Sequence, residues 1–278
     1  MANASSPTQA VVLASYGTTR DDARATCLDP VSDALEQAFP GWLVTRAYTS
    51  RKVRRALDAR GEHVASVTEA LHVLLALGVR RVVVQSGHVV PGASFDEVGA
   101  ALGKCGRLFD EAAVGSPLLS DGSDAFCLAE AVCERYPREA GVALVLVGHG
   151  GGEKGDGLFA QVERAAHALG RTDVLVGTLH GEAGRARVLE ELGSGAAGDA
   201  RLVRLAPLMM CAGAHAHRDM AGPDPASWES SLAAAGFEVE PLQVGLGELP
   251  AVRELVVRHA REAASGMPAA PTEPGASA

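Results

Sequence analysis

The sequence has few aromatic residues and no long apolar run. Phe, Trp and Tyr make up only 4% of the 278 residues, whereas hydrophobic residues make up 47%. A core of these proportions is built mainly from Val, Leu and Ala, as in α/β proteins with buried parallel strands. No apolar stretch reaches the roughly 18 to 20 residues needed to span a bilayer, and the first residues show no signal-peptide pattern. We therefore expect a cytoplasmic protein without membrane partners.

Basic blocks and paired cysteines are also missing. The formal net charge is −9, and no extended Lys/Arg block offers a surface for a phosphate backbone, so nucleic acid is not expected as a partner. The five cysteines are odd in number and contain no C-x-x-C. This argues against a disulfide framework or a structural zinc site and predicts reduced thiols.

Nucleotide-binding and hydrolase motifs are absent as well. The glycine-rich segment GHGGGEKGDG (148–157) has neither the G-x-x-x-x-G-K-[ST] nor the G-x-G-x-x-G spacing that cradles phosphates. No G-x-S-x-G elbow supplies a nucleophile. We expect no nucleotide cofactor.

Short β-rich runs alternate with longer segments of helical periodicity, which is typical of parallel α/β folds. The expected strands are 11–15, 43–48, 81–86, 143–148, 174–179, 201–207 and 238–245. The expected helices lie at 31–39, 64–77, 127–136, 158–169, 228–236 and 251–262, where apolar residues recur at three- and four-residue spacing.

The order of these elements repeats along the chain and predicts two similar lobes, each a parallel sheet flanked by helices. The predicted division is a flexible N-terminus (1–9), an N-terminal lobe (10–138), a C-terminal lobe (139–264) and a disordered tail (265–278) rich in Pro, Ala, Gly and Ser. Polar and Gly-rich residues follow the strands in both halves, where open α/β sheets bind ligands. A cleft between the lobes is the expected site.

Three histidines directly follow predicted strands in the second half: His149, His180 and His215. Imidazole binds late divalent metals and accepts protons near neutral pH. A hydrogen-bonded structural role would fit each histidine singly, and the spacing alone leaves both interpretations open. His88 occupies the matching position in the first half, where a structural role is the simpler interpretation.

Several segments, taken in order, resemble the anaerobic sirohydrochlorin cobaltochelatase family over about residues 10 to 262. The segments are SYGTT, SGHVVPG, LVGHGGG, VGTLHG, CAGAHAHRDMAG and VGLGE. The resemblance implies the class II chelatase fold with a tetrapyrrole between two lobes. It implies that His149 and His215 face the metal and are catalytic. The family's metal-facing Glu is replaced here by His180, so the expected metal ligands are His149, His180 and His215, unless Glu182 takes the place of the family's Glu.

The resemblance also implies the substrate contacts and the reaction. The residues expected to contact the substrate are Tyr16, Gly17, Thr18, His88, Gly150 and Arg218. The implied reaction is ATP-independent insertion of a divalent metal, Co²⁺ first with Ni²⁺ or Fe²⁺ as alternatives, into sirohydrochlorin or a related tetrapyrrole on the route to cobalamin. The alternative is a non-catalytic metal- or tetrapyrrole-binding protein derived from a chelatase. A homo-oligomer is compatible with either.

Overall fold

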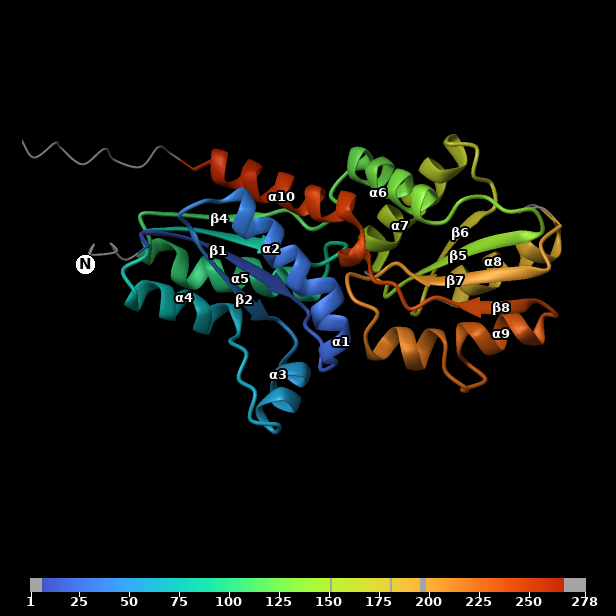
Figure 1. Ribbon diagram of the computed structural model, residues 1–278, viewed down its shortest axis with the longest axis horizontal. Helices are drawn as coiled ribbons and strands as arrows, with labels where there is room; N and C mark the ends of the chain where they lie inside the picture. Colours follow the sequence, from blue (N-terminus) through green and yellow to red (C-terminus); the bar gives the residue numbers. More distant parts are fainter. Residues whose placement is uncertain (1–6, 151, 181, 196–198, 268–278) are drawn as a thin grey trace, which may run out of the picture.

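The computed structural model describes residues 7–150, 152–180, 182–195 and 199–267, which form two α/β lobes joined end to end (Figure 1). Each lobe contains a four-stranded parallel sheet, with strand orders β2-β1-β3-β4 and β6-β5-β7-β8. The two orders are equivalent, so the second half of the chain repeats the first. The strands are β1 (Gln9–Ser15), β2 (Leu43–Tyr48), β3 (Arg81–Ser86), β4 (Glu111–Gly115), β5 (Val142–Gly148), β6 (Val174–Thr178), β7 (Leu202–Pro207) and β8 (Glu238–Pro241).

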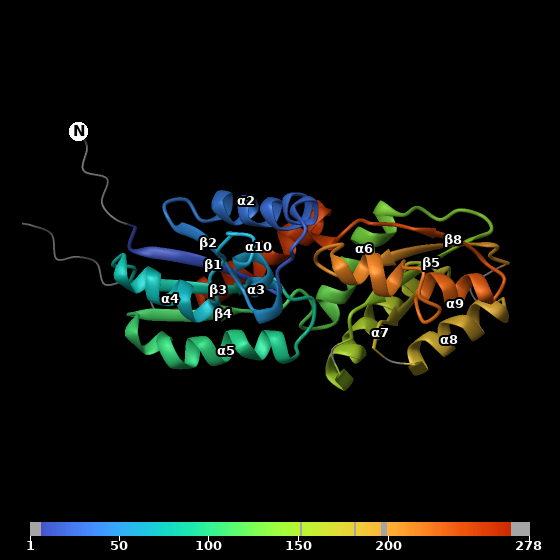
Figure 2. The ribbon, with the colours of Figure 1, turned by 90° about the horizontal axis from the view of Figure 1, so that it is seen from below.

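Helices cover both faces of each sheet (Figure 2). The α-helices are α1 (Asp21–Ala23), α2 (Asp29–Ala38), α3 (Arg51–Asp58), α4 (Val67–Ala76), α5 (Ala93–Cys105), α6 (Gly122–Arg135), α7 (Gly152–Ala168), α8 (Glu182–Gly193), α9 (Trp228–Ala234) and α10 (Pro250–Ser265). Short π- or 3₁₀-segments are η1 (Arg24–Leu28), η2 (Gly106–Leu108), η3 (Ala216–Met220) and η4 (Leu246–Glu248).

The central strands are buried on both faces because their side chains alternate between two helical layers. On β1, Val12 packs with the side chains of α4 and α5, whereas Val11 and Leu13 pack in the cluster that contains α2 and α10. On β5, Val145 packs with α8 and α9, while Leu146 joins the cluster of α6 and α7. This period of two explains why the strands are continuous apolar runs.

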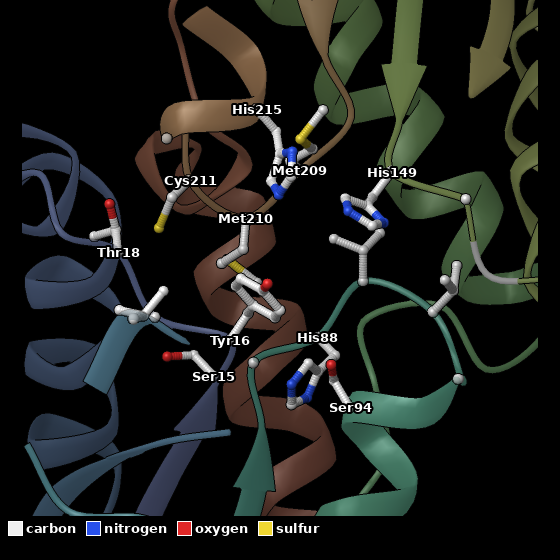
Figure 3. A pocket seen from close by; sticks show the side chains of 18 of the residues that line it. Ser15, Tyr16, Thr18, His88, Ser94, His149, Met209, Met210, Cys211 and His215 are labelled. Carbon is white, nitrogen blue, oxygen red and sulfur yellow. The ribbon is translucent and has the colours of Figure 1, made fainter. Parts of the chain in front are cut away.

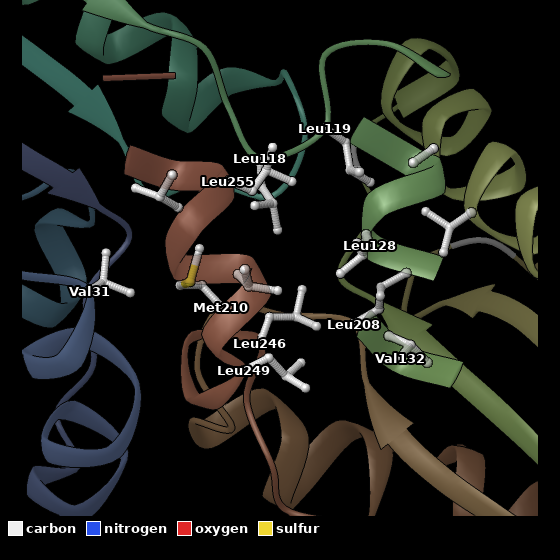
Figure 4. Close-up of a cluster of buried hydrophobic side chains, with 14 of the residues drawn as sticks. Val31, Leu118, Leu119, Leu128, Val132, Leu208, Met210, Leu246, Leu249 and Leu255 are labelled. Carbon is white, nitrogen blue, oxygen red and sulfur yellow. The ribbon is translucent and has the colours of Figure 1, made fainter. Parts of the chain in front are cut away.

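Two helices cross between the lobes. Helix α6 precedes β5 yet packs against α7, and α10 ends the second half yet packs against β3, β4 and α2 of the first. One hydrophobic cluster therefore runs through both lobes (Figure 4). Its members include Val31, Leu118, Leu119, Leu128, Val132, Leu208, Met210, Leu246, Leu249 and Leu255. The chain division at 138 and 139 stays a prediction, and the packing of α6 and α10 crosses it.

Some elements were not expected from the sequence. Strand β4 is short and carries Glu111 and Gly115, so it lacks an apolar run. Helix α3 is dominated by charged residues. Helices α5 and α8 were not predicted either. Of the predicted flexible N-terminus (1–9) and disordered tail (265–278), residues 1–6 and 268–278 lie outside the described residues. Strand β1 already begins at Gln9, and α10 extends to Ser265. No helix in the described ranges has the length and apolar character to cross a bilayer.

Candidate functional site

A cleft of about 920 Å³ lies between the lobes, at the carboxyl ends of the strands (Figure 3). The residues that the sequence predicted for metal or substrate all line it: Tyr16, Gly17, Thr18, His88, His149, Gly150, His180, His215 and Arg218. Loops far apart in the sequence meet here because parallel strands place their carboxyl ends at one edge. The volume lies within the range of about 300 to 1,000 Å³ typical of small-molecule sites.

The three predicted histidines come together on the C-terminal side of this cleft. His149 directly follows β5, His180 follows β6, and His215 precedes η3. The His149 ring lies between the other two, with its centroid 4.8 Å from that of His180 and 4.8 Å from that of His215. Gly150 has a φ of +97°, and a Cβ there would lie 3.3 Å from the His180 carbonyl oxygen. The glycine thus permits the close approach of the two loops.

His215 is oriented by a carboxylate one helical turn away. Its Nδ1 lies 2.6 Å from Oδ2 of Asp219. The Arg218 side chain donates to both oxygens of Asp219, at 2.6 Å from Nε and 3.0 Å from the terminal nitrogen. Hydrogen bonds lower the pKa of Asp219 to about 2, and the bond from Arg218 contributes more than the bond from His215. An ionised Asp219 that accepts the Nδ1 proton leaves the Nε2 lone pair of His215 free for a ligand.

His149 is kept neutral by its surroundings. Burial lowers its pKa, and the neighbouring rings of His215 and His180 lower it further because a second positive charge would be repelled. A neutral imidazole carries the lone pair that metal binding and proton acceptance both require.

The histidines do not form a closed metal cage by themselves. Among the residues that the structure describes, no group of three His, Cys, Asp or Glu side chains is arranged to hold a metal ion. The Glu182 side chain, named above as a substitute for the family's Glu, lies outside the described residues. The joint ligand set of His149, His180 and His215 stays a prediction.

The opposite wall comes from the N-terminal lobe. Tyr16 is 42% exposed, and its ring stands edge-on to His215 with centroids 6.5 Å apart. Gly17 has a φ of +88°, and a Cβ there would lie 2.4 Å from the ring of Tyr48. Thr18 accepts a hydrogen bond from the Arg20 backbone N–H at 3.1 Å. Only glycine fits at position 17, so the segment between strand and helix can pass over the tyrosine.

His88 lines the cleft but has both ring nitrogens engaged. Nε2 lies 3.1 Å from the Thr49 hydroxyl, and Nδ1 lies 3.0 Å from the Ser86 hydroxyl. Burial lowers the pKa of His88 to about 4. These contacts favour the structural interpretation, and a substrate contact by His88 stays a prediction.

Sequence reasoning missed part of the lining. Met209, Met210 and Cys211 follow β7 and face the cleft, although the two methionines are also largely buried. Lys52, near the start of α3, is a further lining residue. Its position two residues after the strand-end segment AYTS was the signal that could have revealed it.

Known proteins resemble this chain in sequence and in fold. The sequence model of the cobalt chelatase (CbiK) family matches residues 9–265. The sirohydrochlorin cobaltochelatase CbiKC of Nitratidesulfovibrio vulgaris is 32% identical over 263 residues, which cover 92% of this chain and 91% of that protein. The sirohydrochlorin cobaltochelatase of Salmonella typhimurium is 29% identical over 269 residues, with 92% and 96% covered.

Solved structures confirm the two-lobe α/β fold. SirB from Bacillus subtilis with Fe³⁺ has a TM-score of 0.62 at 11% identity, over 93% of this chain and 96% of that chain. The sirohydrochlorin chelatase SirB from Bacillus subtilis subspecies spizizenii, in complex with cobalt, has a TM-score of 0.61 at 12% identity, with the same coverage. Because the family model spans nearly all of the described residues, this chain belongs to the cobalt chelatase (CbiK) family.

Proposed function

We propose that this protein inserts a divalent metal, Co²⁺ first, into sirohydrochlorin without a nucleotide. The observation that carries the proposal is the row of His180, His149 and His215 on one wall of a cleft large enough for a tetrapyrrole. Membership of the cobalt chelatase family and relatives named sirohydrochlorin cobaltochelatase support the substrate.

The metal is a substrate that needs only transient ligands. His149 and His215 offer imidazole nitrogens, and the pigment nitrogens complete the coordination as the ion moves from the wall into the macrocycle. Such a transfer does not require a closed protein cage, because a tight cage would retain the ion. His180, on the far side of His149, is the third candidate ligand.

Metallation releases two pyrrole protons, and the same wall offers their acceptors. The lowered pKa of His149 means that this ring is unprotonated before the reaction. Asp219 stays ionised and stabilises a positive charge that forms on His215. We therefore assign proton acceptance to the imidazoles once they release the metal.

Helix α3 supplies positive charge for the carboxylates of the pigment. Among the described residues, Arg51, Lys52 and Arg55 form no ion pair, although the whole chain carries a net charge of −9. Lys52 lines the cleft. By contrast, Arg46 forms an ion pair with Asp29. We assign one carboxylate contact to Lys52. We assign a second to the terminal nitrogen of Arg218 that does not donate to Asp219, because Arg218 also lines the cleft.

The test is anaerobic metallation of sirohydrochlorin with Co²⁺, Ni²⁺ or Fe²⁺. The absorbance of the pigment reports the reaction, and sirohydrochlorin is in large excess over protein. His149→Ala is the variant, and His63→Ala is its matched control because His63 is an exposed histidine outside the cleft lining. We expect many turnovers for the wild type and the control, and loss of turnover in His149→Ala. The metal with the highest kcat/KM identifies the preferred substrate.

A different result would change the proposal. Formation of at most one equivalent of product per protein, with tight pigment binding retained, would assign the chain to a tetrapyrrole-binding protein. Equal turnover in His149→Ala and the wild type would remove the histidine row from the reaction.

A further inference from the structure

Two cysteines meet where the lobes join, and the proposed reaction does not use them. Cys27 lies in η1 of the N-terminal lobe and is fully buried. Cys211 lies in the loop after β7 of the C-terminal lobe, is partly exposed and lines the cleft (Figure 3). A Cβ on Gly245 would lie 2.6 Å from the Cys27 sulfur and 2.8 Å from both the Ala212 nitrogen and the Met210 carbonyl oxygen, so Cys27 lies beside the backbone that carries Cys211. The two cysteines thus bring together segments from opposite lobes.

The GLGE segment (245–248) holds this pair in place. A Cβ on Gly245 would lie 2.6 Å from the sulfur of Cys27, and one on Gly247 would lie 2.2 Å from the Cys27 carbonyl oxygen. Oε1 of Glu248 accepts hydrogen bonds from the Cys27 thiol at 3.7 Å and from the Gly245 N–H at 2.8 Å. The segment fits closely around Cys27, so the sulfur position is built into the fold.

The pair differs from the other cysteines in its readiness to ionise. The hydrogen bond from Cys211 is the largest cause that lowers the pKa of Cys27 to about 7, and the same contact raises that of Cys211. The pair therefore shares one proton and carries a thiolate near neutral pH. Burial instead raises the pKa of Cys133, and Cys105 contacts His72.

We propose that Cys27 and Cys211 are an oxidation site that closes into a reversible disulfide between the lobes when a low-molecular-weight disulfide enters the cleft. Cys211, which lines the cleft, passes its proton to the Cys27 thiolate, attacks the small disulfide, forms a mixed disulfide and releases one small thiolate. Cys27 then loses this proton to solvent. The Cys27 thiolate then attacks the Cys211 sulfur and releases the second. Two protein thiols are oxidised, one small disulfide is reduced to two thiols, and the protons of the protein thiols pass to solvent.

Closure would act on the site because of where Cys211 lies. The residue is four positions before His215, in the loop that carries this histidine. Bringing the two sulfurs to a covalent bond of about 2.05 Å shifts that loop toward η1. This consequence for turnover rests on the proposed function, whereas formation of the disulfide does not.

The experiment uses the full chain, pigment-free and metal-free, with glutathione disulfide as the oxidant. Remaining thiols are alkylated, and intact mass and peptide mapping follow. We expect two of the five thiols to disappear without a retained glutathione, a cross-linked peptide pair containing Cys27 and Cys211, and full reversal by dithiothreitol. The Cys211→Ser variant should keep all of its remaining thiols after treatment with glutathione disulfide. The Cys127→Ser variant should still form the disulfide between Cys27 and Cys211.

The Cys27→Ser variant gives a second, independent test of the proposed disulfide. Without the resolving thiol, the mixed disulfide with glutathione should accumulate on Cys211. A stable glutathione adduct on the wild type, a link between other cysteines, or no loss of thiols would each overturn the proposal. Because this assay contains neither pigment nor metal, its failure leaves the chelatase proposal standing. Failure of metallation likewise leaves the disulfide result intact.

Discussion

The contact between Asp219 and His215 can be tested by removing only the charge of the carboxylate. In Asp219→Asn, an amide of the same shape replaces the group that holds Nδ1 at 2.6 Å. The amide keeps the packing of η3 but accepts a weaker hydrogen bond, and it can instead donate to Nδ1 and select the wrong tautomer. We therefore expect His215 to bind and release the metal less well, while the fold is retained.

The magnitude follows from the kind of hydrogen bond that is lost. A bond to a charged partner contributes about 1.5 to 3 kcal/mol, which corresponds to roughly 10- to 150-fold in an equilibrium or a rate. Changes to carboxylates that orient metal-binding histidines typically cost about 10- to 100-fold. We expect kcat/KM for Co²⁺ to fall by about 10- to 100-fold in Asp219→Asn.

The assay is steady-state metallation at saturating sirohydrochlorin, with metal concentration varied and thermal unfolding recorded in parallel. Asp22→Asn is the matched control, because Asp22 also has a lowered pKa and also accepts hydrogen bonds from a neighbouring arginine, Arg20, but does not line the cleft. A kcat/KM for Asp219→Asn within twofold of the wild type, together with a large loss in His215→Ala, would refute the orienting role of Asp219.

Three further predictions concern the cleft walls. Gly17→Ala should lower the free energy of unfolding by about 2 to 3 kcal/mol in urea titrations, whereas Gly41→Ala, at a similar φ of +83° but with open space around its Cβ, should cost about 1. The wild type should lose about 3 kcal/mol of stability between pH 6.5 and 4, because His88 takes up a proton there when the chain is unfolded but only near pH 4 when it is folded. His88→Gln should abolish this loss. Lys52→Ala should raise KM for sirohydrochlorin about two- to fivefold at low salt. Lys104→Ala, at an exposed position on α5 outside the cleft lining, should leave KM unchanged.

The sequence predicted the two lobes because buried parallel strands leave a strong local signal. Seven of the eight strands were expected, since runs such as the one in β5 are apolar on both faces. Strand β4 was missed because Glu111 and Gly115 interrupt its pattern, although it pairs with β3 in the sheet. His259 on α10 is buried and contacts Asp124 of α6. That contact exists only because α6 and α10 cross between the lobes, which no local pattern indicates.

The place of the site was likewise easier to predict than its chemistry. Strand order alone brings His149, His180 and His215 to one edge, and the structure places them there. Spacing alone does not assign the role of Asp219, because a residue four positions after a histidine contacts it only where the backbone is helical. The segment from Ala216 to Met220 is such a helix. The lysine at the start of α3 was missed for the same reason, since its helix was not expected.

The shared core decides which part of the site can adjust during metal transfer. Side chains from α2, α6, α7 and α10 belong to one hydrophobic cluster, so separating the lobes would expose residues such as Leu128 and Leu255. Each fully buried leucine contributes about 1.5 to 3 kcal/mol on transfer from water, and several would be exposed together. The lobes are therefore held as one body, and under the proposed function the histidine side chains move rather than the lobes. Rotation of the His149 and His215 side chains costs far less than separation of the lobes, which makes it the motion that can bring a metal ion to the macrocycle.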